Sequence, residues 1–138
     1  MDDINLRAPA YYINRELSFL EFNQRVVDLA QDAAVPLLER VRFLAIASSN
    51  LDEFFEIRVA GLKERQERGA TGAGPDGRSI TEQLLAIHAR ARALVAEQYR
   101  ILNDQLTPAL RADFDAKAAA LLASLDAATK SATLAQAR

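Results

Sequence analysis

Hydrophobic positions recur three or four residues apart along most of the chain, and apolar and polar residues never alternate as they do in strands. This spacing places apolar side chains on one face of an α-helix, so the sequence predicts an all-α fold. The first predicted helix runs from about 19 to about 33, with Phe22, Val26 and Leu29–Ala30 on one face. Ser18-Phe19-Leu20-Glu21 is typical of a capping box at its start, and residues 1–16 are predicted to be an extended lead-in.

A second predicted helix begins at Pro36, since proline is favoured at the first helical position. The polar run Ser48-Ser49-Asn50 then interrupts the apolar face, and we expect it to separate the second helix from a third that extends to about Arg68. Asn50 is the expected N-cap of that third helix, followed by acidic residues in the first turn. A single kinked rod is the alternative.

Residues 69–78 contain four of the five glycines and predict a hairpin connection; the ending of a phosphate-binding P-loop is missing. Ser79-Ile80-Thr81-Glu82 is a further capping box and predicts the start of a long fourth helix. Thr107-Pro108 indicates either a kink or a new helix start.

Beyond Pro108, 12 of the last 30 residues are alanine, which favours helix but supplies little packing area. We expect the end to fray from about Thr129. The predicted architecture is an antiparallel bundle of about four main helices, plus an Ala-rich C-terminal helix. The predicted units are a helical domain over 1–107 and a helical tail over 108–138.

Composition narrows the function classes. The chain has 138 residues, 17 basic and 19 acidic side chains, and a net charge of −2. This near balance argues against binding to nucleic acid or to an anionic membrane surface. Cysteine is absent, which excludes disulfides and thiolate chemistry. The sequence has no apolar run long enough to span a membrane and no signal-peptide pattern, so a cytoplasmic location is expected.

Few residues are candidates for catalysis. His88 is the only histidine, and its place on or beside an apolar stripe favours a structural or surface role. Asp52, Glu53 and Glu56 are close together, but no Glu-x-x-His pair accompanies them, so helix-start electrostatics is favoured over a metal site. A lone histidine can still accept a phosphate, so the residues alone leave that role of His88 open, and no metal ligand is predicted.

Two residues are candidates for binding. Asn50 is favoured as a helix cap, but its amide combines a donor and an acceptor, the pattern that an adenine edge requires. Arg58 interrupts the apolar run Phe55-x-Ile57-x-Val59, so its guanidinium is expected either to pair with a carboxylate or to be reserved for a partner.

Four segments together resemble the N-terminal domain of bacterial polyphosphate kinase, in order and spacing, across about residues 11–107. They are Tyr12-Ile13-Asn14-Arg15-Glu16-Leu17-Ser18-Phe19-Leu20-Glu21-Phe22-Asn23-Gln24-Arg25-Val26, Pro36-Leu37-Leu38-Glu39-Arg40-Val41-Arg42-Phe43-Leu44, Ser49-Asn50-Leu51-Asp52-Glu53-Phe54-Phe55 and Arg58-Val59-Ala60-Gly61-Leu62-Lys63.

The resemblance implies an activity for the full-length family. That family transfers the terminal phosphate of ATP to inorganic polyphosphate, with Mg²⁺ and a phosphohistidine intermediate. Its N-terminal domain is a helical bundle that covers one side of the nucleotide site. The asparagine of its Asn-Leu-Asp-Glu-Phe motif contacts adenine and corresponds to Asn50, and Arg58 is expected near the same cleft.

The resemblance also limits what this chain does. Catalytic histidines, phosphate-binding arginines and metal ligands belong to later domains, so contacts with ATP, ADP and polyphosphate are expected mainly through those domains. The segment after Pro108 does not match the family's next domain. We expect the chain alone to be inactive; homo-oligomerisation is left open. The alternative function is a non-catalytic helical module that docks on other domains or subunits.

Overall fold

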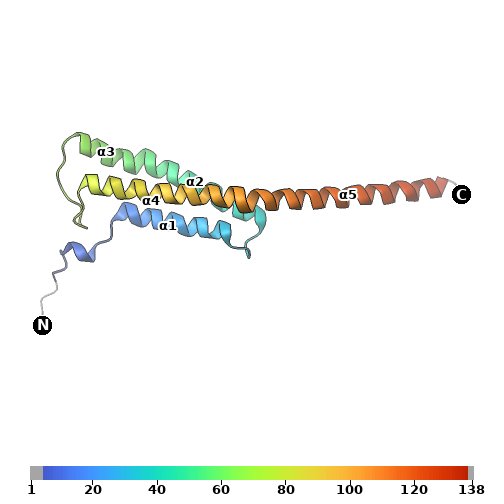
Figure 1. The fold of residues 1–138 in the computed structure, drawn as a ribbon, viewed down its shortest axis with the longest axis horizontal. Helices are drawn as coiled ribbons and strands as arrows, with labels where there is room; N and C mark the ends of the chain where they lie inside the picture. Colours follow the sequence, from blue (N-terminus) through green and yellow to red (C-terminus); the bar gives the residue numbers. More distant parts are fainter. Residues whose placement is uncertain (1–4, 137–138) are drawn as a thin grey trace.

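The computed structural model describes residues 5–136, and its helices join into three rods (Figure 1). A 3₁₀ turn, η1 (Pro9–Tyr11), precedes the first rod, α1 (Arg15–Gln31). The second rod contains α2 (Leu37–Glu53), the π-helical turn η2 (Phe54–Val59) and α3 (Ala60–Glu67). The third rod contains α4 (Ile80–Ile101), the π-helical turn η3 (Leu102–Leu106) and α5 (Thr107–Gln136). The described residues contain no strand, so the all-α prediction is confirmed.

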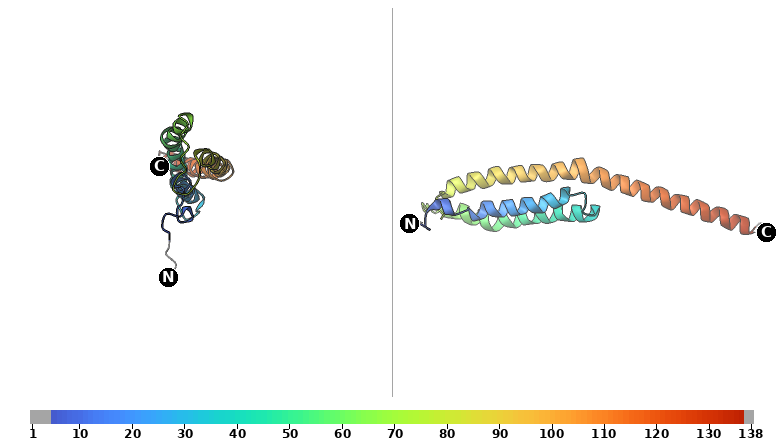
Figure 2. Two further views of the ribbon diagram at one scale, coloured as in Figure 1. Left: turned by 90° about the vertical axis from the view of Figure 1, so that its left-hand side faces the viewer. Right: turned by 90° about the horizontal axis from the view of Figure 1, so that it is seen from below.

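The prediction of about four main helices plus a separate C-terminal helix is wrong in its count. α1 packs against α2 and α4, and α3 packs against α4. The rods run side by side over the length of α1, whereas most of α5 extends beyond the bundle as a single helix (Figures 1 and 2).

The face of α1 that points inward agrees with the predicted one only in part. Leu20, Val27 and Ala30 are fully buried there, whereas Phe22 is 54% exposed and Leu29 is 38% exposed. Between these core positions lies Asn23, a polar residue that is also fully buried. Asn23 is tolerated because its amide is hydrogen-bonded inside the bundle. The sequence prediction is confirmed for Ala30 and in part for Val26, but it followed the largest apolar side chains and therefore wrongly placed Phe22 and Leu29 inward.

The two π-helical turns each shift the buried face by one residue. Buried positions in the second rod follow at steps of three or four as far as Phe54, and the next is Val59, five residues later. The step from Ile101 to Leu106 in the third rod is also five residues. A regular helix would direct Arg58 toward the core after Phe54, since i and i+4 share a face. The π turn buries Val59 in its place and leaves Arg58 exposed.

The expected helix break at residues 48–50 is absent. Asn50 lies inside a continuous helix, and neither its side chain nor those of Ser48 and Ser49 caps a helix start. Ala47 and Leu51 are buried on either side of these polar residues, so tertiary packing overrides a weak local preference. The alternative of a single rod is the correct one.

The first helix also begins earlier than predicted. Asn14 is its N-cap, and its side chain accepts hydrogen bonds from the amides of Glu16 and Leu17 at 3.0 Å each. Ser18 therefore lies within the helix, and the predicted capping box is wrong. Pro36 is the residue just before α2 rather than its first residue.

Other predicted boundaries are confirmed. Ser79 and Glu82 form the capping box at the start of α4, and the glycine-rich segment connects α3 to α4. Thr107 has helical dihedral angles, φ −61° and ψ −46°, so Thr107-Pro108 does not start a separate helix. The rod bends near η3 instead (Figure 2), where the widened turn accommodates the missing proline N–H. Fraying beyond Thr129 and the division at residue 107 stay predictions.

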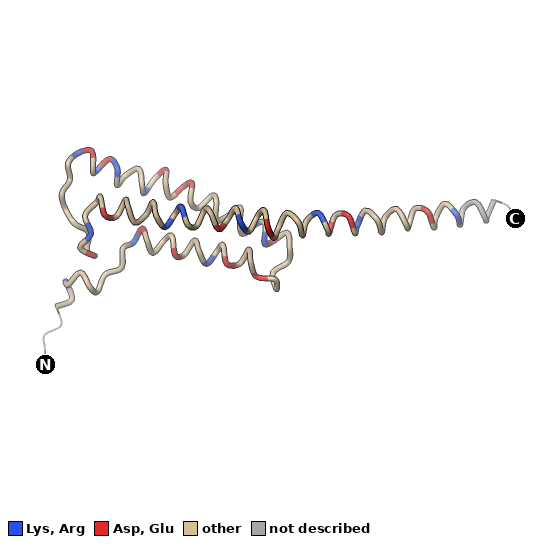
Figure 3. Tube along the Cα trace, viewed as in Figure 1, with Lys and Arg blue, Asp and Glu red and all other residues tan. Residues whose placement is uncertain are grey.

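Positive and negative side chains are interspersed along every rod (Figure 3). Several form ion pairs between or within helices, for example Arg90 with Glu21 between α4 and α1. The described helices are too short or too polar to cross a membrane.

Candidate functional site

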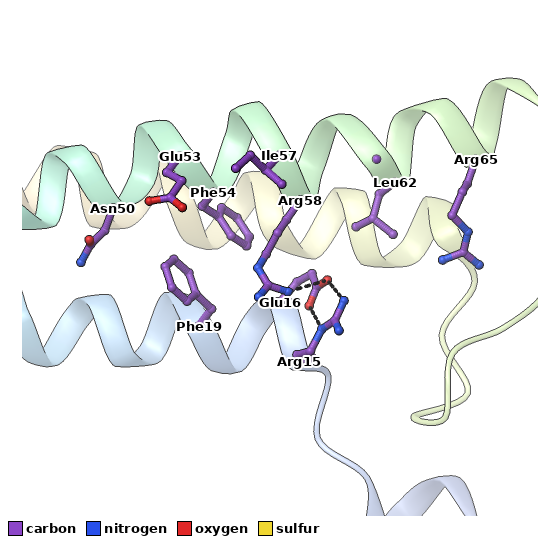
Figure 4. A pocket seen from close by; sticks show the side chains of 11 residues that line it. Arg15, Glu16, Phe19, Asn50, Glu53, Phe54, Ile57, Arg58, Leu62 and Arg65 are labelled. Carbon is purple, nitrogen blue, oxygen red and sulfur yellow. Dashed lines mark hydrogen bonds and ion pairs between the residues drawn. The ribbon is translucent and has the colours of Figure 1, made fainter.

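An open cleft of about 550 Å³ lies between α1 and the second rod. Its lining combines amide, charged and apolar side chains from α1, α2, η2 and α3 (Figure 4). The lining residues are Arg15, Glu16, Phe19, Asn50, Glu53, Phe54, Ile57, Arg58, Gly61, Leu62 and Arg65. Both binding residues predicted from the sequence, Asn50 and Arg58, line this cleft.

The orientation of Asn50 is set by a second asparagine. Nδ2 of Asn50 donates to Oδ1 of Asn23 across 3.2 Å, and Nδ2 of Asn23 donates to the backbone oxygen of Ala47 across 2.9 Å. A backbone carbonyl only accepts, so the Asn23 amide must present nitrogen to Ala47 and oxygen to Asn50. Asn50 must in turn present its nitrogen to Asn23.

This arrangement leaves hydrogen-bonding capacity at the cleft. An Asn side chain has two N–H donors and an acceptor oxygen. One donor of Asn50 is used by Asn23, and none of the hydrogen bonds within the described residues uses its Oδ1. Asn50 is half-buried, and it offers one acceptor and one donor from a fixed position on the wall.

The charged part of the cleft is organised around Glu16. This carboxylate is largely buried; it accepts two hydrogen bonds from Arg15, at 2.9 and 3.1 Å, and lies 3.8 Å from the guanidinium of Arg58. The hydrogen bond with Glu16 raises the pKa of Arg15 above its usual value. The prediction that Arg58 pairs with a carboxylate is confirmed, although the contact is long and the arginine side chain stays 41% exposed.

Apart from Arg58, sequence reasoning placed none of the charged residues of the cleft there: Arg15, Glu16, Glu53 and Arg65. Arg65 follows Arg58 by seven residues, two helical turns, so recognising a continuous rod would have placed both on one side. Arg15 and Glu16 come from α1, and no local signal connects them to α2 or η2. Only the packing of the two rods brings them together.

His88 lies outside this cleft. Its ring is exposed and lies 6.0 Å, centroid to centroid, from the ring of Phe55, which fits the expected surface or structural role. Within residues 5–136 no group of three or more His, Cys, Asp or Glu side chains is arranged to hold a metal ion.

A second groove, of about 540 Å³, lies between α2 and α4. Its lining is mainly apolar and includes Phe55, Val95 and Tyr99. Gln98 also lines it, and the buried Nε2 of Gln98 has no hydrogen-bond partner among the described residues.

The fold and the first cleft define a small all-α domain with a cleft lined by amide, charged and apolar side chains. Sequence comparison identifies the family: residues 12–114 match the polyphosphate kinase N-terminal domain. The match covers about three quarters of the chain, so the chain belongs to that family, and the resemblance stated from the sequence is confirmed.

Individual relatives agree with the family. Polyphosphate kinase of Xylella fastidiosa is 54% identical over 106 residues, which cover 77% of this chain and 15% of the relative. Polyphosphate kinase of Thermosynechococcus vestitus is 50% identical over 105 residues, 76% of this chain and 14% of the relative. Polyphosphate kinase of Rhodopirellula baltica is 52% identical over 99 residues, which cover 72% of this chain and 12% of the relative. The chain thus matches only about one seventh of the length of these relatives, and no solved structure matches it.

Proposed function

We propose that this domain covers one side of the nucleotide site of a polyphosphate kinase, with Asn50 facing the adenine base. Family membership and the names of the relatives support the enzyme class. The observation that carries the proposal is the orientation of Asn50. Asn23 holds its amide at the cleft wall, and its acceptor oxygen and second N–H are left for a ligand.

The chemistry of adenine matches this pair of groups. The exocyclic amino group is a donor that suits Oδ1, and a neighbouring ring nitrogen is an acceptor that suits the remaining N–H. Phe19 and Phe54 also line the cleft, and their rings stack on each other with centroids 5.1 Å apart. Phe54 is almost fully buried, so the partly exposed Phe19 provides the apolar surface beside the amide, where a purine can bury part of its face.

Arg58 and Arg65 lie further along the same wall (Figure 4). In this proposal they border the nucleotide, and Glu16 offsets part of the charge of Arg58. Binding of the triphosphate, Mg²⁺ and polyphosphate, and phosphoryl transfer itself, are assigned to parts of the enzyme outside this chain. A cytoplasmic location remains the expectation from the sequence.

One amide and a partial wall supply little binding energy after the entropic cost of association. We therefore expect the isolated chain to be inactive and to bind ATP weakly or undetectably. Calorimetry that shows binding tighter than about 1 µM, equivalent to about −8 kcal/mol, would contradict this expectation.

The direct test places this domain in a complete enzyme. Residues 1–107 replace the matching segment of the Xylella fastidiosa relative, and Asn50→Ala is compared with Asn103→Ala in that chimera. Asn103 is exposed on η3 and does not line the cleft. Because Asn50→Ala removes the hydrogen bonds of the amide to adenine, we expect about a tenfold higher KM for ATP in this variant. Asn103→Ala should change the KM little.

The thermal midpoint of each variant separates a binding effect from a folding effect. An Asn50→Ala chimera with native-like stability and an unchanged KM for ATP would refute the adenine contact. A KM that rises equally for ATP and GTP would show that Asn50 does not recognise the base.

The groove between α2 and α4 favours the second candidate, a docking module. Its apolar lining and the buried, unpaired Nε2 of Gln98 fit a protein surface that offers a carbonyl oxygen. Under this function Tyr99→Ala in the chimera would weaken assembly or stability of the full enzyme, while Asn50→Ala would leave the KM unchanged.

A further inference from the structure

Between residues 107 and 131, α5 has five large apolar side chains; four of them, Leu110, Phe114, Leu121 and Leu125, form a stripe, and Leu122 lies about 60° beyond it. An α-helix turns by about 100° per residue, so the four fall within an arc of about 60°. Phe114, Leu121 and Leu125 are 71%, 63% and 56% exposed, and Leu110 is half-buried. Surface helices of globular proteins normally cover such a stripe by packing.

The spacing of this stripe is symmetric. Its members are separated by four, seven and four residues, and the midpoint lies between Lys117 and Ala118. A second copy of the helix, antiparallel about that midpoint, therefore places its own Leu125 opposite Leu110 and its Leu121 opposite Phe114. Every large side chain of the stripe meets an apolar partner.

The bundle determines the direction of pairing. Leu106 lies one turn before Leu110 on the same face; it is fully buried in η3, which packs against α2. A parallel partner in register would bring its whole bundle alongside α2, whereas an antiparallel partner brings only its residues from about 129 onward beside Leu106. An antiparallel partner places the two bundles at opposite ends of the pair (Figure 2 shows the free length of α5), and it opposes the helix dipoles.

We propose that α5 is a self-association surface through which two copies of this chain pair antiparallel, centred between Lys117 and Ala118. The contact from Leu110 to Leu125 is about 23 Å long. Eight large apolar side chains bury on the order of 1,000 Å² in total, the low end for a specific interface. The dimer is therefore weak and reversible, with a dissociation constant of about 1 µM or higher.

Lys117 lies close to the two-fold axis of the pair. Its Nζ is already 2.7 Å from a carboxylate oxygen of Asp113 on the same helix. This local ion pair reduces the repulsion between the two lysines, so the stripe tolerates a charge beside its centre.

Single introduced cysteines test the geometry, because the chain has no cysteine of its own. The two copies of an Ala118→Cys residue lie about 1.5 Å apart along the paired axes, so mild oxidation gives a disulfide-linked dimer. The two copies of an Ala128→Cys residue, on the same face, lie about 31 Å apart, too far for a disulfide, so this variant gives no covalent dimer. Equal cross-linking of both variants, or cross-linking of Ala128→Cys alone, overturns the antiparallel arrangement.

Sedimentation velocity over a range of protein concentrations tests the surface itself. Leu121→Asp inserts a charge into the stripe and is expected to weaken dimerisation about a hundredfold or more. Ala119→Asp adds the same charge to the opposite face of α5 and is expected to change it less than about threefold. Circular dichroism verifies that both variants stay helical. A wild-type chain that remains monomeric at about 1 mM, or equal weakening by both substitutions, refutes the proposal.

Discussion

Asn23 is the buried polar residue on which both the bundle and the candidate site depend. It is fully buried and makes two hydrogen bonds, one to the backbone oxygen of Ala47 and one from Asn50. Asn23→Ala removes both bonds and leaves a small cavity between α1 and α2. Each lost bond costs about 1 kcal/mol, and the lost packing contributes about 1 kcal/mol more.

We therefore expect Asn23→Ala to lower the free energy of unfolding by about 2–3 kcal/mol. For a chain of this size the thermal midpoint falls by about 10 °C. Asn50→Ala removes only the weaker bond at the half-buried cleft wall and costs about 0.5–1 kcal/mol. Asn23→Asp is the isosteric control: its carboxylate cannot donate to the Ala47 carbonyl, and burying its charge costs more than Asn23→Ala does.

The assay is urea unfolding followed by circular dichroism for both single variants and the double variant. Because the two amides share one bond, the double-mutant cycle should give a coupling energy of about 0.5–1 kcal/mol. Additive effects would show that the two amides do not interact. A loss below about 0.5 kcal/mol in Asn23→Ala would refute the reasoning from burial and hydrogen bonding.

Two further predictions concern η2 and the start of α4. Deleting Arg58 places Val59 four residues after Phe54, which restores a regular helical turn; urea unfolding should change by less than about 1 kcal/mol. Deleting one residue from the regular part of α2 instead rotates the following core positions by about 100°. This deletion should lower the free energy of unfolding far more. Ser79→Ala should cost about 1 kcal/mol in the same assay. The backbone hydrogen bond from Ser79 lowers the pKa of Glu82 below its usual value of 4.5. This carboxylate therefore stabilises the fold above pH 4.5 and stops doing so as the pH falls through the lowered pKa. The decrease in the free energy of unfolding on acidification should therefore be smaller in Ser79→Ala than in the wild type. An equal decrease in both would contradict the assignment.

Local chemistry allowed part of the fold to be predicted. The Ser79 capping box needs only residues three apart, so the sequence located the start of α4 correctly. Asn14 has the same capping chemistry, but Ser18 offered a competing signal one turn later, and only packing of the earlier turn selects Asn14. The only sequence signal of the π turn at Phe54–Val59 is Arg58, which interrupts an apolar run.

The candidate site divides in the same way. Asn50 and Arg58 were identified from residue type and from the resemblance, but the expected role of Asn50 as a helix cap is wrong. Its orientation depends on Asn23, which lies 27 residues earlier in the sequence. Nothing local relates those two amides, since they meet only when α1 packs against α2.

The sequence alone determined the helical class of this protein and its main connections, because periodicity, caps and glycine-rich turns act within a few residues, and the resemblance of four segments identified its family. Only the tertiary structure decided which face of α1 is buried, that α2 continues through Asn50, and which charges share the cleft. Those outcomes depend on one helix finding its packing partner. Burial of a complete apolar face outweighs the smaller preferences of single residues for a cap or a break.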